Sequence, residues 1–343
     1  MRFTVLPPAG GGHREARGRP PWQAGGMPLT LVEMDSADFA RRRAPLIAGY
    51  AEAITTSRGL TVAEAVAEAE RDIAEKLPRG SATPGLLMRK AEWDGTEIGW
   101  IWVTLPGPAR PELAWIGNIE VDPGFRSRGY AGAIITAVGA ELAGLGVPRL
   151  GLNVFGANST AIRVYERLGF EVYAQQRSRE LTGIPTAEGI ELTPMTDYES
   201  RIEALFADFA QDLVQEQGLW HGEAETRAAR ELAELLPRGV RTKGMILRTV
   251  AADGVPVGWV WAGLPAPPRP GLGWLHNIEI DEAHRGRGHG RAAIAAVEAE
   301  LAGRGVRRLG LNVHGANSGA RRLCDRLGYR LLAQQMAKDL PAR

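Results

Sequence analysis

The sequence contains few of the residues that stabilise secreted domains or hold a chain in a membrane. It has one cysteine, Cys324, among 343 residues, so no disulfide can form within the chain and nothing requires an oxidising compartment. No apolar run approaches the roughly 18 residues that span a bilayer. The net charge is only +1, which gives no general attraction to nucleic acid or to an anionic membrane. These absences predict a cytoplasmic protein without nucleic-acid or membrane partners.

Residues 1–27 differ in composition from the rest of the chain. They are rich in glycine, proline and arginine, and they cannot bury enough apolar surface to offset the entropy lost on ordering. They also lack the apolar core of a signal peptide. We therefore expect a disordered extension over residues 1–27, followed by a globular chain long enough for about two domains.

The remaining chain contains one pattern twice. Asn118 and Asn277 occupy equivalent positions, 277 − 118 = 159 residues apart, and Asp94-Gly95 recurs at the same offset as Asp253-Gly254. A solenoid needs at least three shorter repeats, so the pattern indicates two similar domains in tandem. We place them at residues 28–187 and 188–343, related by a pseudo-twofold axis and packed on each other.

In each half a central strand leads through a glycine-containing turn into a helix. In the first half the strand covers residues 115–121 and the helix begins at Tyr130. Gly129 and Ala131 carry little or no side chain, so an anion can approach the backbone there. The free N–H groups and positive dipole end of a helix start suit a phosphate, and Arg126 and Arg128 add permanent positive charge.

Two ordered motifs, each present twice, resemble those of the GNAT N-acetyltransferase superfamily. Arg126-x-x-Gly129-x-Ala131 and Arg285-x-x-Gly288-x-Gly290 resemble its acyl-CoA pyrophosphate loop. The segment from Asn158 to Phe170 resembles its Asn-x-x-Ala-x-x-x-Tyr-x-x-x-Gly-Phe helix. The resemblance covers about residues 28–343 and implies two α/β (α+β) units, each with a mixed, mostly antiparallel sheet flanked by helices. It implies acetyl-CoA, or another acyl-CoA, as co-substrate, bound by Val121, Arg126, Ser127, Arg128, Gly129, Tyr130, Ala131 and Asn158 in the first half and by Ile280, Arg285, Gly286, Arg287, Gly288, His289, Gly290 and Asn317 in the second.

The resemblance places Tyr165 at the position of the general acid that protonates the departing CoA thiolate. A phenol suits this role, because its pKa of about 10 exceeds the value of about 8.5 for a thiol. The alternative is a tyrosine of the core. The second half has Cys324 at this position, since 324 − 165 = 159. A thiol is a weaker donor and often a small core residue, so we expect the first domain to be the better catalyst.

The general base is less clearly indicated. The attacking amine must lose a proton, and Glu120 on the central strand is our candidate, with Glu279 as its counterpart. Strand alternation leaves open whether Glu120 faces the site. Some family members carry the glutamate on the next strand, where this chain has Asn153 and Asn312. His276, His284 and His289 form no recognisable ligand set, so we expect no metal.

Three features leave alternatives open. Trp100 and Trp102 share one strand face and either line an acceptor pocket or belong to the core. The usual family unit closes with two strands, whereas each half here has room for one; either the other half completes the sheet or the last strand bends. The function we expect is acetyl transfer to a small-molecule amine by direct attack. The alternatives are an acyl-CoA-binding scaffold or sensor and a transferase for aminoacyl or longer acyl groups.

Overall fold

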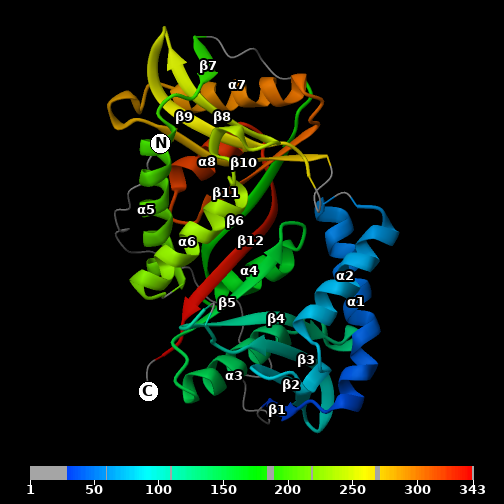
Figure 1. Ribbon diagram of the computed structural model, residues 1–343. Coiled ribbons are helices and arrows are strands. Elements are labelled where there is room, and N and C mark those ends of the chain that lie inside the picture. The colour runs from blue at the N-terminus through cyan, green and yellow to red at the C-terminus, as the bar shows by residue number, and fades with distance from the viewer. Residues whose placement is uncertain are drawn as a thin grey trace, which may run out of the picture. The chain divides into compact units, whose positions relative to one another are not determined.

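The computed structural model describes residues 29–58, 60–108, 110–183, 189–217, 219–266 and 271–341; the predicted extension over residues 1–27 lies outside these ranges. Contacts divide the described chain into two compact units (Figure 1). The first unit comprises residues 29–173 with 333–341, and the second comprises residues 174–332. The domains predicted at residues 28–187 and 188–343 follow the internal repeat. The compact units differ from them, because residues 174–183 belong to the second unit and residues 333–341 to the first. Among the described helices, none is both long and apolar enough to cross a membrane.

The first unit has strand order β1-β2-β3-β4-β5-β12. Its neighbouring strands are antiparallel except β4 and β5, which are parallel. The elements in chain order are β1 (Thr30–Glu33), α1 (Ser36–Arg58), α2 (Val62–Lys76), the 3₁₀ turn η2 (Gly80–Ala82), β2 (Leu86–Trp93), β3 (Thr96–Thr104), β4 (Leu113–Val121), the 3₁₀ turn η3 (Pro123–Phe125), α3 (Tyr130–Gly144), β5 (Arg149–Phe155), α4 (Ser159–Arg167), the start of β6 (Glu171–Glu180) and most of β12 (Arg330–Asp339).

The second unit repeats this order as β7-β8-β9-β10-β11-β6. Its parallel pair is β10 and β11. Its elements, besides the rest of β6, are β7 (Ile190–Pro194), α5 (Tyr198–Gln217), α6 (His221–Leu235), the 3₁₀ turn η4 (Gly239–Arg241), β8 (Met245–Ala252), β9 (Val255–Gly263), β10 (Leu272–Ile280), the 3₁₀ turn η5 (Glu282–His284), α7 (His289–Gly303), β11 (Arg308–His314) and α8 (Ser318–Arg326). The predicted fold, two α/β units with mixed and mostly antiparallel sheets, is confirmed.

The two repeats exchange their last strands. Strand β12, from the end of the chain, pairs antiparallel with β5 of the first unit, and β6 pairs antiparallel with β11 of the second. Met336 on β12 is fully buried in the core of the first unit. The strand that each sequence half lacks is therefore supplied by the other half, which decides between the two alternatives that the sequence left open. The exchange gives the backbone groups of β5 and β11 a hydrogen-bonding neighbour.

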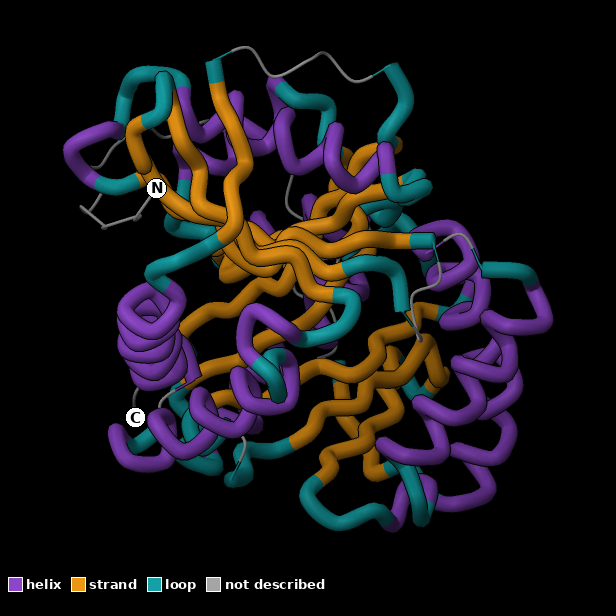
Figure 2. The backbone as a smooth tube through the Cα atoms, turned by 45° about the horizontal axis from the view of Figure 1, so that its top comes forward, coloured by secondary structure: helices purple, strands orange, loops and turns teal. Residues whose placement is uncertain are grey.

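Each sheet is covered by helices on both faces (Figure 2). In the first unit, α3 and α4 pack on the face that carries Ile101 and Val103. Helices α1 and α2 pack on the opposite face, where Trp100 and Trp102 are 0% and 2% exposed. Of the two interpretations that the sequence left open for these tryptophans, an acceptor pocket or the core, the structure therefore supports the core.

Local signals in the sequence set the ends of several elements. Asp94 and Gly95 both have positive φ, 52° and 68°, as the hairpin between β2 and β3 requires. Helix α2 begins with a capping box in which the Thr61 side chain accepts from the Glu64 N–H and the Glu64 carboxylate accepts from the Thr61 N–H. Each of these signals lies within a few residues of the turn or helix start that it sets.

Gly99 allows β3 and β4 to approach closely beside the predicted site. A Cβ at Gly99 would lie 2.2 Å from the carbonyl oxygen of Glu120, and one at Gly258 would lie 2.0 Å from that of Glu279. Both obstacles are backbone atoms, which cannot move without shifting a strand. The close approach therefore fixes the position of the central strand at the glutamate.

We predict that Gly99→Ala lowers the free energy of unfolding by roughly 1–3 kcal/mol, because the methyl group overpacks the strand pair. Urea denaturation measures this. Gly49→Ala is the control: Gly49 is exposed in α1 with nothing within 4 Å of its Cβ position, so alanine there should be neutral or stabilising by up to about 1 kcal/mol. Equal stability of the two variants would show that the close approach constrains nothing.

Candidate active site

The central feature of the site is an opening between the two parallel strands. Residues 113–116 of β4 pair with residues 149–152 of β5, and the pairing stops there although both strands continue. The register with β3 shifts at Gly117, which marks a β-bulge. The second unit has the same construction, with pairing over residues 272–275 and 308–311 and a register shift at His276.

Hydrogen-bond alternation shows which backbone groups face this opening. The Asp122 N–H donates to the Ile98 carbonyl at 2.9 Å, so Asp122 and Ile98 form a hydrogen-bonded pair. In an antiparallel ladder such pairs alternate with non-hydrogen-bonded ones. The next pair, Val121 and Gly99, is therefore a non-hydrogen-bonded pair, and the N–H of Val121 does not point to β3. This N–H is directed to the open side of β4. Ile280 has the same place, because the Asp281 N–H donates to the Val257 carbonyl at 2.9 Å.

The loop after β4 presents further backbone donors. Ser127 and Gly129 have left-handed φ values of 63° and 86°, and Gly286 and Gly288 have 78° and 87°. Gly129 is the N-cap of α3 and has no side chain to cap it. The first intrahelical bond runs from the Ala133 N–H to the Gly129 carbonyl, which leaves the N–H groups at the helix start available to an anion.

The loop arginine has a contact that the sequence did not predict. Arg126 donates from Nε to the Val121 carbonyl at 2.9 Å, and Arg285 donates likewise to the Ile280 carbonyl at 2.9 Å. Each arginine thereby ties its loop to the end of the central strand. Arg126 and the next three residues are exposed, as a phosphate site requires.

Tyr130 differs from its neighbours in the loop. Its side chain is buried, with its ring 5.7 Å from that of Trp93 and 6.1 Å from that of Phe125. Only the backbone N–H of Tyr130 is placed to meet a ligand, so the predicted binding role is restricted to that group.

Tyr165 lies in α4, on the face of the sheet that α3 also covers. Its ring is 5.7 Å from that of Phe170, and burial raises the pKa of Tyr165 to about 12. The phenol therefore keeps its proton at neutral pH. Within the part of the chain that the structure describes, the Tyr165 hydroxyl makes no hydrogen bond.

Cys324 in α8 is 3% exposed, and burial raises the pKa of its thiol to about 11. A nucleophilic cysteine needs a lowered pKa and access. Cys324 has neither, so it has the properties of a core residue of the second unit.

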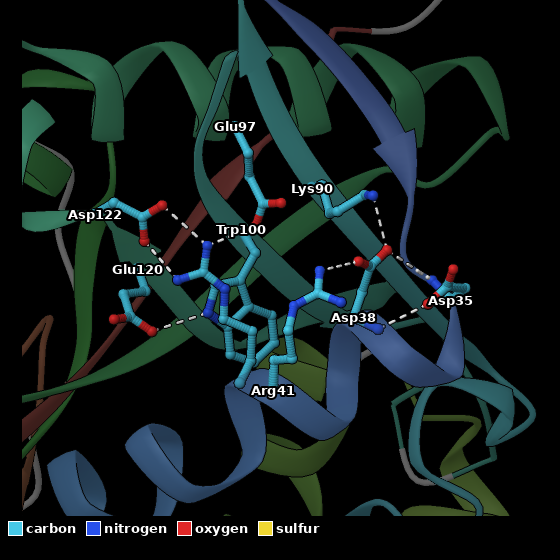
Figure 3. A network of polar contacts seen from close by, with 9 residues as sticks. Asp35, Asp38, Arg41, Lys90, Glu97, Trp100, Glu120 and Asp122 are labelled. Atoms are coloured by element: carbon cyan, nitrogen blue, oxygen red, sulfur yellow. Dashed lines mark hydrogen bonds and ion pairs between the residues drawn. The ribbon is translucent and has the colours of Figure 1, made fainter. Parts of the chain in front are cut away.

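Glu120 faces the opposite side of the sheet from Tyr165. Its Oε2 accepts a hydrogen bond from Trp100 Nε1 at 2.9 Å (Figure 3). Trp100 packs against α1 and α2. Glu279 accepts from Trp259 at 2.9 Å in the second unit. Candidate acid and base thus flank β4 from opposite faces. Trp100 and Glu120 are cross-strand partners on β3 and β4, a pairing that depends on the register across the bulge at Gly117.

Two asparagines of the helix motif act as helix caps. Asn158 Oδ1 accepts from the Ala161 N–H at 3.0 Å, and Asn317 Oδ1 accepts from the Ala320 N–H at 2.8 Å. Such caps typically contribute about 1 kcal/mol to stability. The structure thus gives both residues a role that the sequence analysis did not assign, and their contact with CoA stays a prediction. Asn153 and Asn312 are exposed on β5 and β11.

The histidines of the second unit have separate surroundings. The His276 ring stacks on Trp261 with centroids 4.5 Å apart, and the His284 and His289 rings are 6.5 Å apart. Within the described ranges, no group of three or more histidine, cysteine, aspartate or glutamate residues is arranged to hold a metal ion.

A family model described as "Acetyltransferase (GNAT) family" matches residues 56–170 and 206–329, together more than half of the chain. The chain belongs to the GNAT acetyltransferase family. Because the family model matches once in each repeat, the predicted tandem arrangement is confirmed. The family and the acetyltransferases among the relatives confirm the predicted N-acetyltransferase activity. The family uses acetyl-CoA as co-substrate and acylates amines of several classes.

Relatives of this tandem GNAT protein include both short and long chains. The uncharacterized N-acetyltransferase YdgE of Bacillus subtilis is 27% identical over 146 residues, which are 42% of this chain and 92% of that protein. A mycothiol acetyltransferase of Kineococcus radiotolerans is 29% identical over 246 residues, 69% of this chain and 75% of that protein. A solved GCN5-related N-acetyltransferase from Sphaerobacter thermophilus shares the fold, with a TM-score of 0.50, 21% identity and coverage of 92% and 97% of the two chains.

We predict that Gly129→Asp weakens CoA binding to the first unit by about tenfold, because a carboxylate at the helix start repels the phosphate. Isothermal titration calorimetry with CoA measures this, and Gly288→Asp tests the second unit. Gly169→Asp is the matched control, since Gly169 has a similar φ of 81° and lies just after the far end of α4, with nothing within 4 Å of its Cβ position. Equal CoA affinity in Gly129→Asp and Gly169→Asp would remove this loop from the binding site.

Proposed function

We propose that the first unit transfers the acetyl group of acetyl-CoA to a small-molecule amine by direct attack, without a covalent enzyme intermediate. The observation that carries this proposal is the Val121 N–H on the open edge of β4, eight residues before Gly129, the N-cap of α3. One segment thus offers a donor for a thioester carbonyl and a set of donors for a pyrophosphate.

Binding and positioning follow from this segment. The loop from Arg126 to Ala131 holds the pyrophosphate through backbone N–H groups and positive charge. With the nucleotide end fixed, the acyl group is confined to the opening beside β4, where the Val121 N–H polarises the carbonyl and stabilises the oxyanion.

The two proton transfers are assigned to opposite faces of the sheet. The amine nitrogen attacks the acyl carbon and passes a proton to Glu120, directly or through water. The C–S bond then breaks, and Tyr165 supplies a proton to the departing sulfur. The raised pKa of Tyr165, about 12, supports its role as donor, because the phenol is protonated throughout the neutral range.

The second unit keeps the binding elements but not the phenol. Gly286 and Gly288 supply the left-handed positions of its loop, whereas Cys324 replaces the tyrosine. We therefore propose that it binds acyl-CoA and turns it over more slowly, or not at all. Such a unit is a scaffold or sensor, the second candidate function.

The acceptor is assigned only by class. The relative from Kineococcus radiotolerans is named for mycothiol, and this name supports a small-molecule acceptor. At 29% identity we assign only this class and not mycothiol itself.

We predict that Tyr165→Phe lowers kcat by about 100-fold, the lower end of the range for general acid–base catalysis, while the Kd for acetyl-CoA changes by less than about twofold. Release of CoA thiol with a panel of amines measures turnover, and calorimetry measures binding. Cys324→Ala, at the equivalent position, is the control and should leave kcat within about twofold. Unchanged turnover in Tyr165→Phe would exclude the phenol as acid. Binding of acetyl-CoA by the wild type, without CoA release for any amine, would favour the sensor.

We also predict that Glu120→Gln lowers kcat/KM at pH 7 and that raising the pH recovers part of the loss. The reason is that a larger fraction of the amine is already deprotonated at higher pH, so a base is needed less. A pH profile from 6.5 to about 9.5 covers the amine titration. Glu279→Gln, with the same tryptophan contact in the other unit, is the control. A constant ratio of mutant to wild-type rate across the profile would contradict the assignment of Glu120 as base.

A further inference from the structure

In both units, an arginine on the first helix of that unit forms a bidentate ion pair with the aspartate that follows the central strand. Arg42 in α1 donates from Nη1 to Asp122 Oδ1 at 2.5 Å and from Nη2 to Asp122 Oδ2 at 2.9 Å. Arg201 in α5 makes the same two-pronged contact with Asp281, with 3.0 Å for its Nη2–Oδ2 bond. The arginines are equivalent, since 201 − 42 = 159. Bidentate pairs of this kind fix orientation as well as distance.

The contact lies at the junction between strand and loop. Asp122 directly follows Val121 and precedes η3, and its side chain caps no helix. The Val121 peptide is thereby held from two sides, because Arg126 binds its carbonyl oxygen and Arg42 binds the next side chain. Figure 3 shows Asp122 and Glu97 gathered beside Trp100 and Glu120.

We call the Arg42–Asp122 pair, and the Arg201–Asp281 pair of the second unit, the anchor. The arginine of each anchor also binds a second carboxylate, and this carboxylate differs between the units. Arg42 Nη2 also donates to Glu97 at 2.5 Å, whereas Arg201 Nε donates to Asp197 at 2.8 Å. Pro256 stands at the position of Glu97 in the second unit, since 256 − 97 = 159. The second pair therefore uses Asp197, which lies four residues before Arg201 and directly precedes α5.

The equivalent helix aspartate of the first unit, Asp38, is engaged elsewhere. It pairs with Lys90 at 2.7 Å and with the neighbouring Arg41. Thr249 replaces Lys90 in the second unit, since 249 − 90 = 159. With threonine at this position, Asp197 has no such lysine partner, and it binds Arg201 instead. The surroundings of the anchor have changed while its contact with Asp122 or Asp281 has been kept.

The anchor is partly buried. The side chains of Arg42 and Asp122 are 20% and 22% exposed, so salt screens their attraction less than that of a surface pair. The Arg201 guanidinium holds the pKa of Asp281 below its usual value, the largest contribution being their hydrogen bond.

We propose that Arg42, and Arg201 in the second unit, are positioning residues that hold the CoA loop and the oxyanion donor in register by tying them to the first helix. They touch neither CoA nor the acyl group and act through Asp122 and Asp281. The loop contains Ser127 at a left-handed φ of 63°, a conformation that persists only where the surroundings enforce it. This inference rests on the proposed binding of CoA by that loop.

The test measures CoA affinity and turnover in the full chain, with Gly288→Asp present throughout so that the first unit is observed alone. Arg42→Gln should raise the Kd for CoA by about tenfold and lower kcat as well, as expected for the loss of a partly buried, hydrogen-bonded charge pair. Arg41→Gln is the matched control. Arg41 is the next residue of α1, is exposed, and pairs only with Asp38 among the described residues, so both quantities should stay at the starting values. Asp122→Asn, which keeps the side-chain volume, provides a second variant if Arg42→Gln does not fold.

A compensation experiment separates positioning from stability. Glu97→Ala removes one arm of the anchor and should weaken CoA binding by a few-fold, in line with the loss of one charged hydrogen bond. Adding Lys90→Thr and Arg41→Ser reproduces the second unit, where Asp197 joins the arginine. We expect this triple variant to regain the CoA affinity while its thermal stability stays lowered. A recovery of stability without a recovery of affinity would indicate a structural role and overturn the proposal.

The outcomes distinguish this inference from the proposed function. If the parent protein binds CoA and Arg42→Gln binds it equally well, the anchor proposal is wrong and the function stands. If neither the parent nor the wild type produces heat with CoA or acetyl-CoA, the proposed function fails and the anchor proposal fails with it.

Discussion

The site depends on an interrupted strand pair. Strands β4 and β5 hydrogen-bond for four residue pairs and then part, while β3 and β12 remain paired to their outer edges. An unpaired backbone donor inside a sheet is costly unless water or a ligand satisfies it. The Val121 N–H is directed into this gap, and the next backbone donors lie at the start of α3. A thioester-bearing nucleotide fits such a segment because its two acceptor groups, the carbonyl and the pyrophosphate, are far apart on one chain.

The sequence predicts those parts of the site that are local. The left-handed glycines, the helix start and the Asp94-Gly95 turn are set by residues within one turn of chain, so their positions follow from residue type alone. Glu120 illustrates the limit. Its strand was predicted, but the face it points to depends on the register across the bulge at Gly117, and a shift of one residue exchanges the two faces. Only the hydrogen bond from Trp100 decides the matter.

The parts that the sequence did not predict are those that join distant segments. Strands β6 and β12 carry nearly the same pattern, with Ala174-Gln175-Gln176 and Ala333-Gln334-Gln335 in equivalent positions. Either strand therefore has side chains that fit the inward and outward positions of either sheet. The residue types alone do not show which sheet each strand joins. The anchor of Arg42 on Asp122 spans 80 residues, and a charged residue on an amphipathic helix is indistinguishable in sequence from one that faces solvent.

Comparing the two units separates the binding of the donor from the chemistry performed on it. The backbone features recur in both: the parted strands, the glycine loop and the N–H of Val121 or Ile280. The side chains that hold this backbone also recur, although the second partner of Arg201 is Asp197 whereas that of Arg42 is Glu97. The phenol does not recur. In the mechanism we propose, backbone groups recognise CoA and one side chain protonates the sulfur, so a single change at the position of Tyr165 removes the proposed acid and leaves the loop intact. Such a duplication can keep one unit that binds and transfers and one that only binds.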